Sequence, residues 1–361
     1  MNVLTRVLRA PDELARLDDK GFFDLKVQAD AAGLLGRVWH LAQRQGVPLP
    51  GYAGWHFSGA FKLAARQQAQ AIREIRELAA LFDWLGVDWV LLKGAAYIAL
   101  DLPVAQGRTF ADIDILVPRE QLSMVERHLH MRHWLRTEID DYDDRYYRQW
   151  MHEIPPLRHQ QRGTVLDVHH NILPLTNRDV PDIGRFDVQV CPHRQLGTVR
   201  ALSDVDLCIH AAVHLFSESE YHNGLRDLSD LDLLLRHFSA GDGDFVARLR
   251  ERAALHGLER YTDLALIACG DVLKTPLPSE GGVPRRATRG QKVLAAAYRR
   301  IFTPAHSRCR PPGHGLAAFL LYCRGHLIRM PLRLLVPHLL RKAVMRAFDG
   351  LRAKELSRDG L

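Results

Sequence analysis

The stretch Asp112-Ile-Asp-Ile-Leu-Val117 is the part of the sequence that decides the fold. Acidic and aliphatic side chains alternate along it, as is typical of a β-strand with one face in a core. Asp112 and Asp114 then project from one face of the strand. Two carboxylates about 7 Å apart repel each other unless a cation lies between them, and oxygen ligands at this spacing suit Mg²⁺. Taken alone, the pattern also fits an edge strand with solvated acids.

Two neighbouring segments supply the other parts of a site. Upstream, Leu92-Lys-Gly-Ala95 runs from a strand pattern through a glycine into a helix pattern, a geometry that turns backbone N–H groups toward an anion. Lys93 adds a positive charge there. Downstream, Asp167 stands alone in an apolar strand, where an acid is costly unless it is paired or binds metal. A phosphate cradle and three carboxylates together predict metal-assisted phosphoryl or nucleotidyl transfer.

Strand and helix patterns alternate around these segments. Apolar residues at three- and four-residue steps predict a helix over roughly residues 57–85 that ends at Gly86. Strands are predicted at 88–93, 112–117, 134–139 and 164–170, with helices between the first three. The order predicts an α+β fold in which helices flank a small mixed sheet.

The remaining patterns divide the chain into four parts. Residues 1–56 are predicted to form an N-terminal helical extension, 57–200 the catalytic domain, 201–275 a helical domain and 276–361 a basic C-terminal helical segment. Turn formers at 181–198 predict a connection. Ser203, with Asp206 three residues on, predicts the start of a helix that reaches His237.

Four motifs taken together resemble a known family. They are Leu-Lys-Gly-Ala-Ala at 92–96, Arg108, Ala-Asp-Ile-Asp-Ile-Leu-Val at 111–117, and Leu-Asp-Val-His at 166–169. The pattern is similar to that of the uncharacterised bacterial nucleotidyltransferase family of the polymerase-β-like superfamily, over roughly residues 60 to 240. The resemblance implies that Asp112 and Asp114 hold two Mg²⁺ ions. It also implies that Asp167 helps to bind one ion and orients or deprotonates the attacking hydroxyl.

The resemblance further implies a nucleotide site for an NTP co-substrate. Lys93, Gly94 and Arg108 would face the triphosphate. The superfamily usually has Gly-Ser where this chain has Gly94-Ala95, so a hydroxyl contact to phosphate is missing and Lys93 is the candidate to replace it. A run at 226–235 resembles the helix that follows the catalytic domain, and its Asp230 is expected to face the cleft.

Several histidines and acids have weaker signals. His169 shares the face of Asp167, and it either contacts a phosphate, positions the attacking group, or simply bonds Asp167. His210 and His214 lack the glutamate of a zinc-protease helix and are expected to be packing residues. The acids at 140–144 have no ordered spacing and are expected to form a solvated loop.

The charge of the chain is unevenly distributed. The net charge is +7, yet residues 1–280 carry 32 basic and 39 acidic side chains, while 281–348 carry 14 basic ones and no acid. We expect the 281–348 segment to contact an anionic membrane surface or a nucleic acid. Five scattered cysteines favour a reducing cytoplasm. No stretch of about 18 apolar residues lacks a charge. We therefore expect a cytoplasmic protein, with peripheral attachment at the inner face of the membrane as the alternative.

These signals support two hypotheses of different classes. The first is a Mg²⁺-dependent nucleotidyltransferase that moves an NMP from an NTP to a hydroxyl-bearing acceptor and releases pyrophosphate. The second is a catalytically silent scaffold with the same fold that docks through its basic C-terminus. Ala95 favours the second, and the three carboxylates favour the first.

Overall fold

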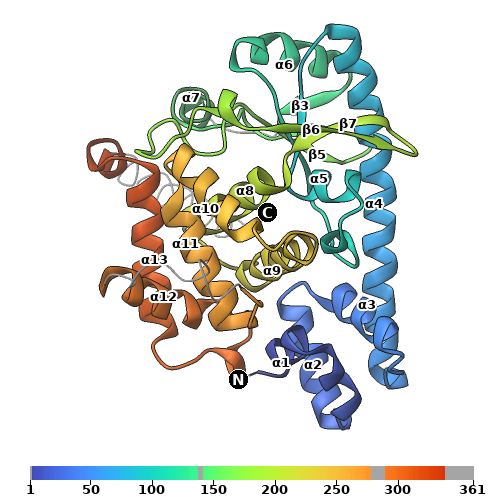
Figure 1. The fold of residues 1–361 in the computed structure, drawn as a ribbon. Coiled ribbons are helices and arrows are strands. Elements are labelled where there is room, and N and C mark those ends of the chain that lie inside the picture. Colours follow the sequence, from blue (N-terminus) through green and yellow to red (C-terminus); the bar gives the residue numbers. More distant parts are fainter. Residues whose placement is uncertain (1, 137–140, 278–288, 338–361) are drawn as a thin grey trace, which may run out of the picture.

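The computed structural model describes residues 2–136, 141–277 and 289–337. Its N-terminal part is helical, as expected. The first helices are α1 (Val3–Arg9), α2 (Asp19–Ala31), α3 (Leu35–Gln45) and α4 (Gly51–Leu85), with a 3-10 turn at Pro11–Arg16. Helix α4 runs along one side of the molecule from the N-terminal helices up to the sheet (Figure 1).

Helix α4 begins earlier than the apolar periodicity indicates. It starts at Gly51 and continues without a break through positions 56 and 57. Its C-terminus is where the sequence predicts it, because Gly86 adopts the left-handed conformation (φ 66°) that ends many helices. Ile75, Leu78 and Phe82 of its last turns are buried in the core.

One mixed sheet of seven strands organises the rest of the chain. Its strands are β1 (Val90–Leu92), β2 (Asp112–Leu116), β3 (Trp134–Arg136), β4 (Leu157–His159), β5 (Val165–His169), β6 (Val188–His193) and β7 (Gly197–Leu202). They lie in the order β3-β4-β5-β2-β1-β7-β6. Strand β2 is parallel to β5 and antiparallel to β1, while β1 is parallel to β7.

The expectation of a small sheet is wrong. Strands β6 and β7 form an antiparallel hairpin within the region that the turn formers predict to be a connection. Every residue of β6 is at least partly exposed, so apolar and polar side chains do not alternate along it as they do in a strand with one buried face. Pro192 obscures the strand pattern further, because proline is uncommon inside strands. The hairpin reaches the sheet through a single β-bridge pair, Leu91 with Ala201.

The helices after β1 cover the sheet and build the lower part of the molecule. They are α5 (Lys93–Ala99), α6 (Leu122–Met131), α7 (Asp141–Trp150), α8 (Asp204–Ser217), α9 (Gly224–Gly241), α10 (Phe245–His256) and α11 (Glu259–Ala268). Ser203 caps α8 as predicted, because its side chain accepts a hydrogen bond from the backbone N–H of Asp206. The helix predicted to reach His237 is instead two helices, α8 and α9, separated by a turn before Gly224.

The prediction that the acids at 140–144 form a solvated loop is wrong for those residues that the structure describes. Residues from Asp141 onward begin helix α7, whose N-terminus favours negative charge. Asp144 accepts hydrogen bonds from Arg136 (2.7 Å) and Arg148 (3.1 Å), so this carboxylate is paired. Asp140 lies outside the described residues.

The C-terminal helices α12 (Arg289–Ile301) and α13 (His314–Arg329) stand on the side of the molecule opposite α4 (Figure 1). Tyr298 of α12 and Phe302, which directly follows this helix, pack their rings against Phe216 at the end of α8. Arg324 of α13 donates to the Phe216 carbonyl (2.8 Å) and to the Tyr298 hydroxyl (2.9 Å). Residues 278–288 and 338–348 of the basic segment lie outside the described part. Within that part, no helix is long and apolar enough to cross a membrane.

Candidate functional site

The sheet places the three predicted carboxylates on two neighbouring strands. Asp114 of β2 pairs in register with Asp167 of the parallel strand β5, and Leu92 of β1 is its partner on the other side. Residues in register on adjacent strands share a face, and so do residues two apart on one strand. Asp112, Asp114, Asp167 and His169 therefore lie on one face of the sheet. Ile113 and Ile115 lie on the other face and are buried.

Asp114 is the buried centre of this group. Its Oδ1 accepts a hydrogen bond from the Lys93 ammonium at 2.7 Å and lies 3.0 Å from Nε2 of His169. Burial alone raises the pKa of an acid, but the Lys93 charge and the His169 contact outweigh it and hold the pKa of Asp114 below its usual value. Asp114 is therefore a permanent negative charge in the core of the site.

The other two carboxylates are less well compensated. Asp112 lies at the exposed start of β2, and partial desolvation together with the Asp114 charge raises its pKa. Desolvation, followed by the Asp114 and Glu153 charges, raises the pKa of Asp167 to about 7. The Oδ1 atom of Asp167 is buried and has no hydrogen-bond partner among the described residues. An unpaired buried carboxylate oxygen is costly, so this group favours a bound cation.

The donor set is chemically suited to Mg²⁺. Three carboxylates supply hard oxygen atoms, the ligand type that this ion prefers, together with substrate phosphates. Lys93 supplies one positive charge against the charges of Asp112, Asp114, Asp167 and Glu153, so the site has an excess of negative charge. A divalent cation would balance it.

Lys93 occupies the junction between β1 and α5 in an unusual conformation. Its φ is +44°, a region that residues with a side chain rarely adopt. Burial works against its charge, but the Asp114 and Glu153 carboxylates outweigh this and raise its pKa. The Lys93 ammonium, which the sequence predicts to face the triphosphate, is thus bound to Asp114 in this structure.

Gly94 and Ala95 are packed tightly behind Lys93. A Cβ atom on Gly94 would lie 2.5 Å from Cδ1 of Phe110, so glycine is needed for the approach of this ring. Ala95 as a whole residue is 1% exposed, so neither its methyl group nor its backbone reaches the surface of the site.

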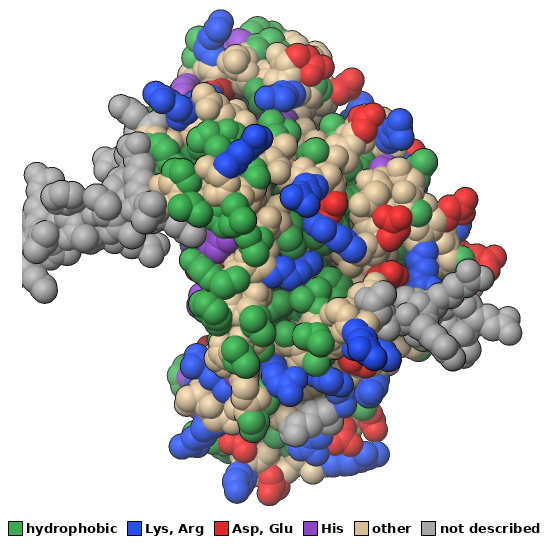
Figure 2. All heavy atoms as spheres, turned by 90° about the vertical axis from the view of Figure 1, so that its left-hand side faces the viewer, with side chains coloured by type: hydrophobic (Ala, Val, Ile, Leu, Met, Phe, Trp, Pro, Cys, Tyr) green, Lys and Arg blue, Asp and Glu red, His purple; other side chains and the backbone are tan. Residues whose placement is uncertain are grey.

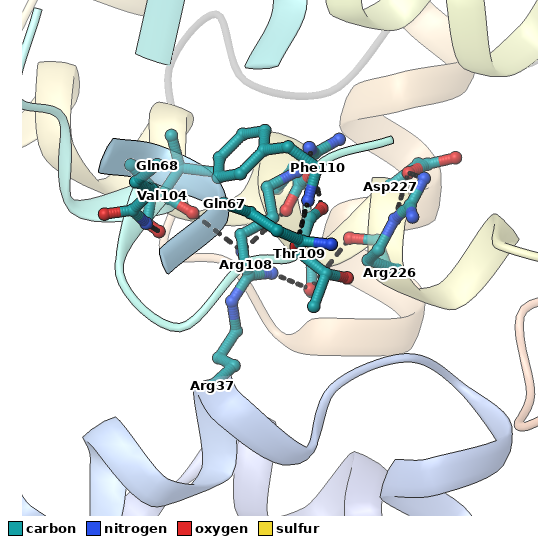
Figure 3. Close-up of polar contacts among 12 residues, drawn as sticks. Arg37, Gln67, Gln68, Val104, Arg108, Thr109, Phe110, Arg226 and Asp227 are labelled. Atoms are coloured by element: carbon teal, nitrogen blue, oxygen red, sulfur yellow. Dashed lines mark hydrogen bonds and ion pairs between the residues drawn. The ribbon is translucent and has the colours of Figure 1, made fainter. Parts of the chain in front are cut away.

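Arg108 and Asp230 are brought together by the fold. The Arg108 Nε donates to Asp230 Oδ2 at 2.7 Å, and its guanidinium lies over the Phe110 ring. Arg37 of α3 donates to the other oxygen of Asp230, also at 2.7 Å, and to the Val104 carbonyl at 2.9 Å. Figure 3 shows Arg37 reaching up from its helix toward Arg108. Sequence patterns do not reveal Arg37, because a single arginine in an amphipathic helix has no motif around it.

The positive side chains near Asp112 form a second group. The charges of Lys93, Arg108 and Arg226 each act to lower the pKa of Asp112, but desolvation and the Asp114 charge outweigh them and the net shift is upward. Arg226 contacts its neighbour Asp227, and both are labelled in Figure 3. All three cations are largely buried and paired with a carboxylate, and together they are a positive group that would attract a polyanionic substrate.

His169 is buried and is a neighbour of Asp114 as well as of Asp167. Its Nδ1 lies 3.3 Å from Oε2 of Glu153, a residue that no sequence motif marks. His210 of α8 is buried and His214 is half-buried, and desolvation followed by the Lys93 charge lowers the pKa of His210 to about 3 and that of His214 well below its usual value. They are neutral, consistent with packing residues that line the back of the site.

The comparisons with known proteins give one family and one structural likeness. A family model described as "Uncharacterised nucleotidyltransferase" matches residues 24–274. The crystal structure of an antigenic nucleotidyltransferase-like protein from Paracoccidioides brasiliensis is 11% identical, with a TM-score of 0.33, and the match covers 57% of this chain and 92% of that chain. No curated protein matches the sequence significantly. Because the family model spans well over half of the sequence, the chain belongs to the family of uncharacterised nucleotidyltransferases.

Proposed function

We propose that this protein is a Mg²⁺-dependent nucleotidyltransferase. It transfers an NMP unit from an NTP to a hydroxyl-bearing acceptor and releases pyrophosphate. The observation that carries the proposal is the set of three carboxylates on adjoining strands, one of which, Asp167, has a buried oxygen with no partner in the part of the chain that the structure describes. Family membership supports the reaction class.

The side chains of the site have separable tasks in this reaction. Asp112, Asp114 and Asp167 would hold Mg²⁺, which neutralises charge on the phosphates. Lys93 keeps Asp114 ionised by donating to it. Asp167 would orient the acceptor hydroxyl or take its proton as the hydroxyl oxygen bonds to the α-phosphorus and pyrophosphate departs. Arg108 and Arg226 would attract the triphosphate by their positive charge.

The test is the removal of the exposed acid. Asp112→Asn, alone and combined with Asp114→Asn, should abolish transfer of label from α-³²P NTPs to acceptors in a cell extract. The single change is informative because Asp112 is exposed and its loss leaves the buried Lys93–Asp114 pair intact. Asp101→Asn is the matched control, since Asp101 is exposed, lies outside the site, and has a φ of +50° that asparagine tolerates. Full labelling by the Asp112→Asn variant would refute the proposal.

The catalytically silent scaffold is less well supported. A scaffold has no need for a carboxylate oxygen that is buried and unpaired. Thermal unfolding with Mg²⁺ and each NTP separates the two hypotheses, because an enzyme should be stabilised by millimolar ligand and a silent scaffold should not.

We further propose that the basic segment binds an anionic lipid surface. Its described part, 289–337, lies outside the family match and contains no acid. On this part, large apolar side chains that are about half exposed or more include Leu316, Phe319, Leu320, Leu327, Leu332 and Val336. Figure 2 looks onto this side of the molecule, where apolar side chains lie among lysines and arginines. Apolar groups that enter the headgroup region, beside cations, favour lipid over nucleic acid.

Vesicle binding tests this surface. The protein should sediment with phosphatidylcholine vesicles that contain phosphatidylglycerol and not with phosphatidylcholine alone, and salt should weaken the binding. Leu316→Ser combined with Phe319→Ser should weaken it at least about tenfold, since each side chain buries apolar area. Val190→Ser, at an equally exposed valine of β6, should have no effect. Binding to RNA or DNA that the double variant retains, without vesicle binding by the wild type, would contradict the proposal.

A further inference from the structure

A second set of potential ligands lies directly behind the carboxylates. Ligand atoms of His152, Glu153 and His169 lie within 4.8 Å of one another. The segment that contains His152 and Glu153 is tied to β5 by a bridge between Glu153 and His169. Two imidazoles and one carboxylate are the donors of borderline transition metals, whereas Mg²⁺ prefers oxygen alone.

The contacts of His169 show why a cation belongs here. If its Nε2 carries the proton that Asp114 Oδ1 accepts at 3.0 Å, then Nδ1 carries a lone pair. That lone pair lies 3.3 Å from Glu153 Oε2, and Nδ1 is buried with no hydrogen-bond partner among the described residues, so a metal ion bound to both atoms would satisfy it. The 3.3 Å separation equals the distance of about 3.3–3.4 Å between two ligand atoms of a tetrahedral centre with bonds of about 2.0–2.1 Å.

The surroundings of His152 favour a metal ion over a second proton on His169. Its Nδ1 is buried and has no hydrogen-bond partner within the described ranges, and its ring centroid lies 5.3 Å from that of His169. A second proton on His169 would leave this nitrogen unsatisfied. A metal ion would use it as the third ligand, and the contact of His169 with Asp114 would be the carboxylate–histidine–metal arrangement seen at many zinc sites.

We propose that His152, Glu153 and His169 form a second metal site, for Zn²⁺ or a similar transition-metal ion, distinct from the three aspartates. The ion fixes the His169 ring, which positions Asp114 through its Nε2–H. Because it is bound by other ligands, this site stands or falls independently of the nucleotidyltransferase proposal.

Cobalt titration of tag-free protein, stripped of metal and kept in excess Mg²⁺, tests the site. Co²⁺ should bind with one-to-one stoichiometry, give the visible absorption of a low-coordinate site, and be displaced by Zn²⁺. His152→Gln and Glu153→Gln should each weaken binding at least about tenfold. His170→Gln is the matched control, a buried histidine beside His169, and it should bind as the wild type does. Thermal unfolding of each variant checks that it folds.

Three outcomes would overturn the proposal. The first is Co²⁺ binding by His152→Gln and Glu153→Gln that equals the wild type. The second is binding that is lost in Asp112→Asn but kept in His152→Gln, which places the ion on the aspartates. The third is no binding by the wild type at micromolar Co²⁺.

Discussion

Asp167 shows how one residue can be unfavourable for the fold and useful for the chemistry. It is more than half buried beside two other acids, and these surroundings raise its pKa to about 7. In the unfolded chain its pKa is about 3.9. Folding between these values requires proton uptake, so the contribution of Asp167 to stability decreases as the pH rises from about 4 to 7.

This behaviour predicts the effect of an asparagine at the same position. Without metal, Asp167→Asn should stabilise the fold at pH 8 by on the order of 2–4 kcal/mol and have little effect at pH 4, as measured by urea unfolding. Mg²⁺ should stabilise the wild type at pH 8 more than the variant, because the ion replaces the proton. An equal response of both proteins to Mg²⁺ would remove Asp167 from the set of ligands.

At the scale of elements, the sequence predicts best where one face of an element is strictly apolar. Strands β2 and β5 are found within one residue, because Ile113, Ile115, Leu166 and Val168 must point into the core. Strand β6 is missed because neither of its faces is fully buried. Strand β4 has only three residues and is too short for a period of two to stand out.

The same distinction applies to the candidate site. Asp112, Asp114 and Asp167 can be predicted because short strands and their register place them together. The contacts of Asp230 with Arg37 and Arg108 cannot be predicted, because the three residues come from three separate segments of the chain. Glu153 has no motif, and only the bridge to His169 brings it to the site.

The junction of β1 and α5 offers a prediction at this scale. Alanine normally stabilises a helix by about 1 kcal/mol relative to glycine. At Gly94, however, its Cβ would lie 2.5 Å from the Phe110 ring, and overpacking costs about 1–3 kcal/mol. Gly94→Ala should therefore destabilise the protein. In a Phe110→Ala background the same change should be neutral or stabilising, and a double-mutant cycle by urea unfolding measures the difference. An equal cost in both backgrounds would show that the ring is not the obstacle.

At the scale of the whole molecule, buried or half-buried arginines join the N-terminal helices and the C-terminal helices to the central part of the chain. Arg37 joins the N-terminal helices to the loop before β2 and to α9. Arg324 and Arg329 join α13 to the end of α8 through the Phe216 carbonyl and the Glu218 carboxylate. The positive charge of the C-terminal part is therefore partly used for attachment, and the exposed remainder forms the proposed lipid surface.

The contacts of Asp230 make the sharpest prediction for the molecule as a whole. Asp230 and Arg37 are buried and Arg108 nearly so, and the single carboxylate balances both guanidinium groups. Asp230→Asn leaves two unpaired charges in the interior and should cost about 3–5 kcal/mol in urea unfolding. Arg37→Met should cost less, because Asp230 and Arg108 still pair and the methionine fills most of the space.

Asp227→Asn is the control for this comparison. Asp227 lies one turn earlier on α9, but its partner Arg226 is its own neighbour in sequence, so the pair joins no separate segments. If Asp230→Asn is no more costly than Asp227→Asn, the two arginines do not depend on Asp230 for their charge balance. If it is more costly, as we expect, Arg108 should also lose its fixed position, and Asp112, whose pKa Arg108 lowers, should then titrate at a higher pH. Mutation of a residue that does not touch Asp112 would thus change the Mg²⁺ affinity of the site, which a titration of metal-dependent stabilisation at fixed pH would reveal.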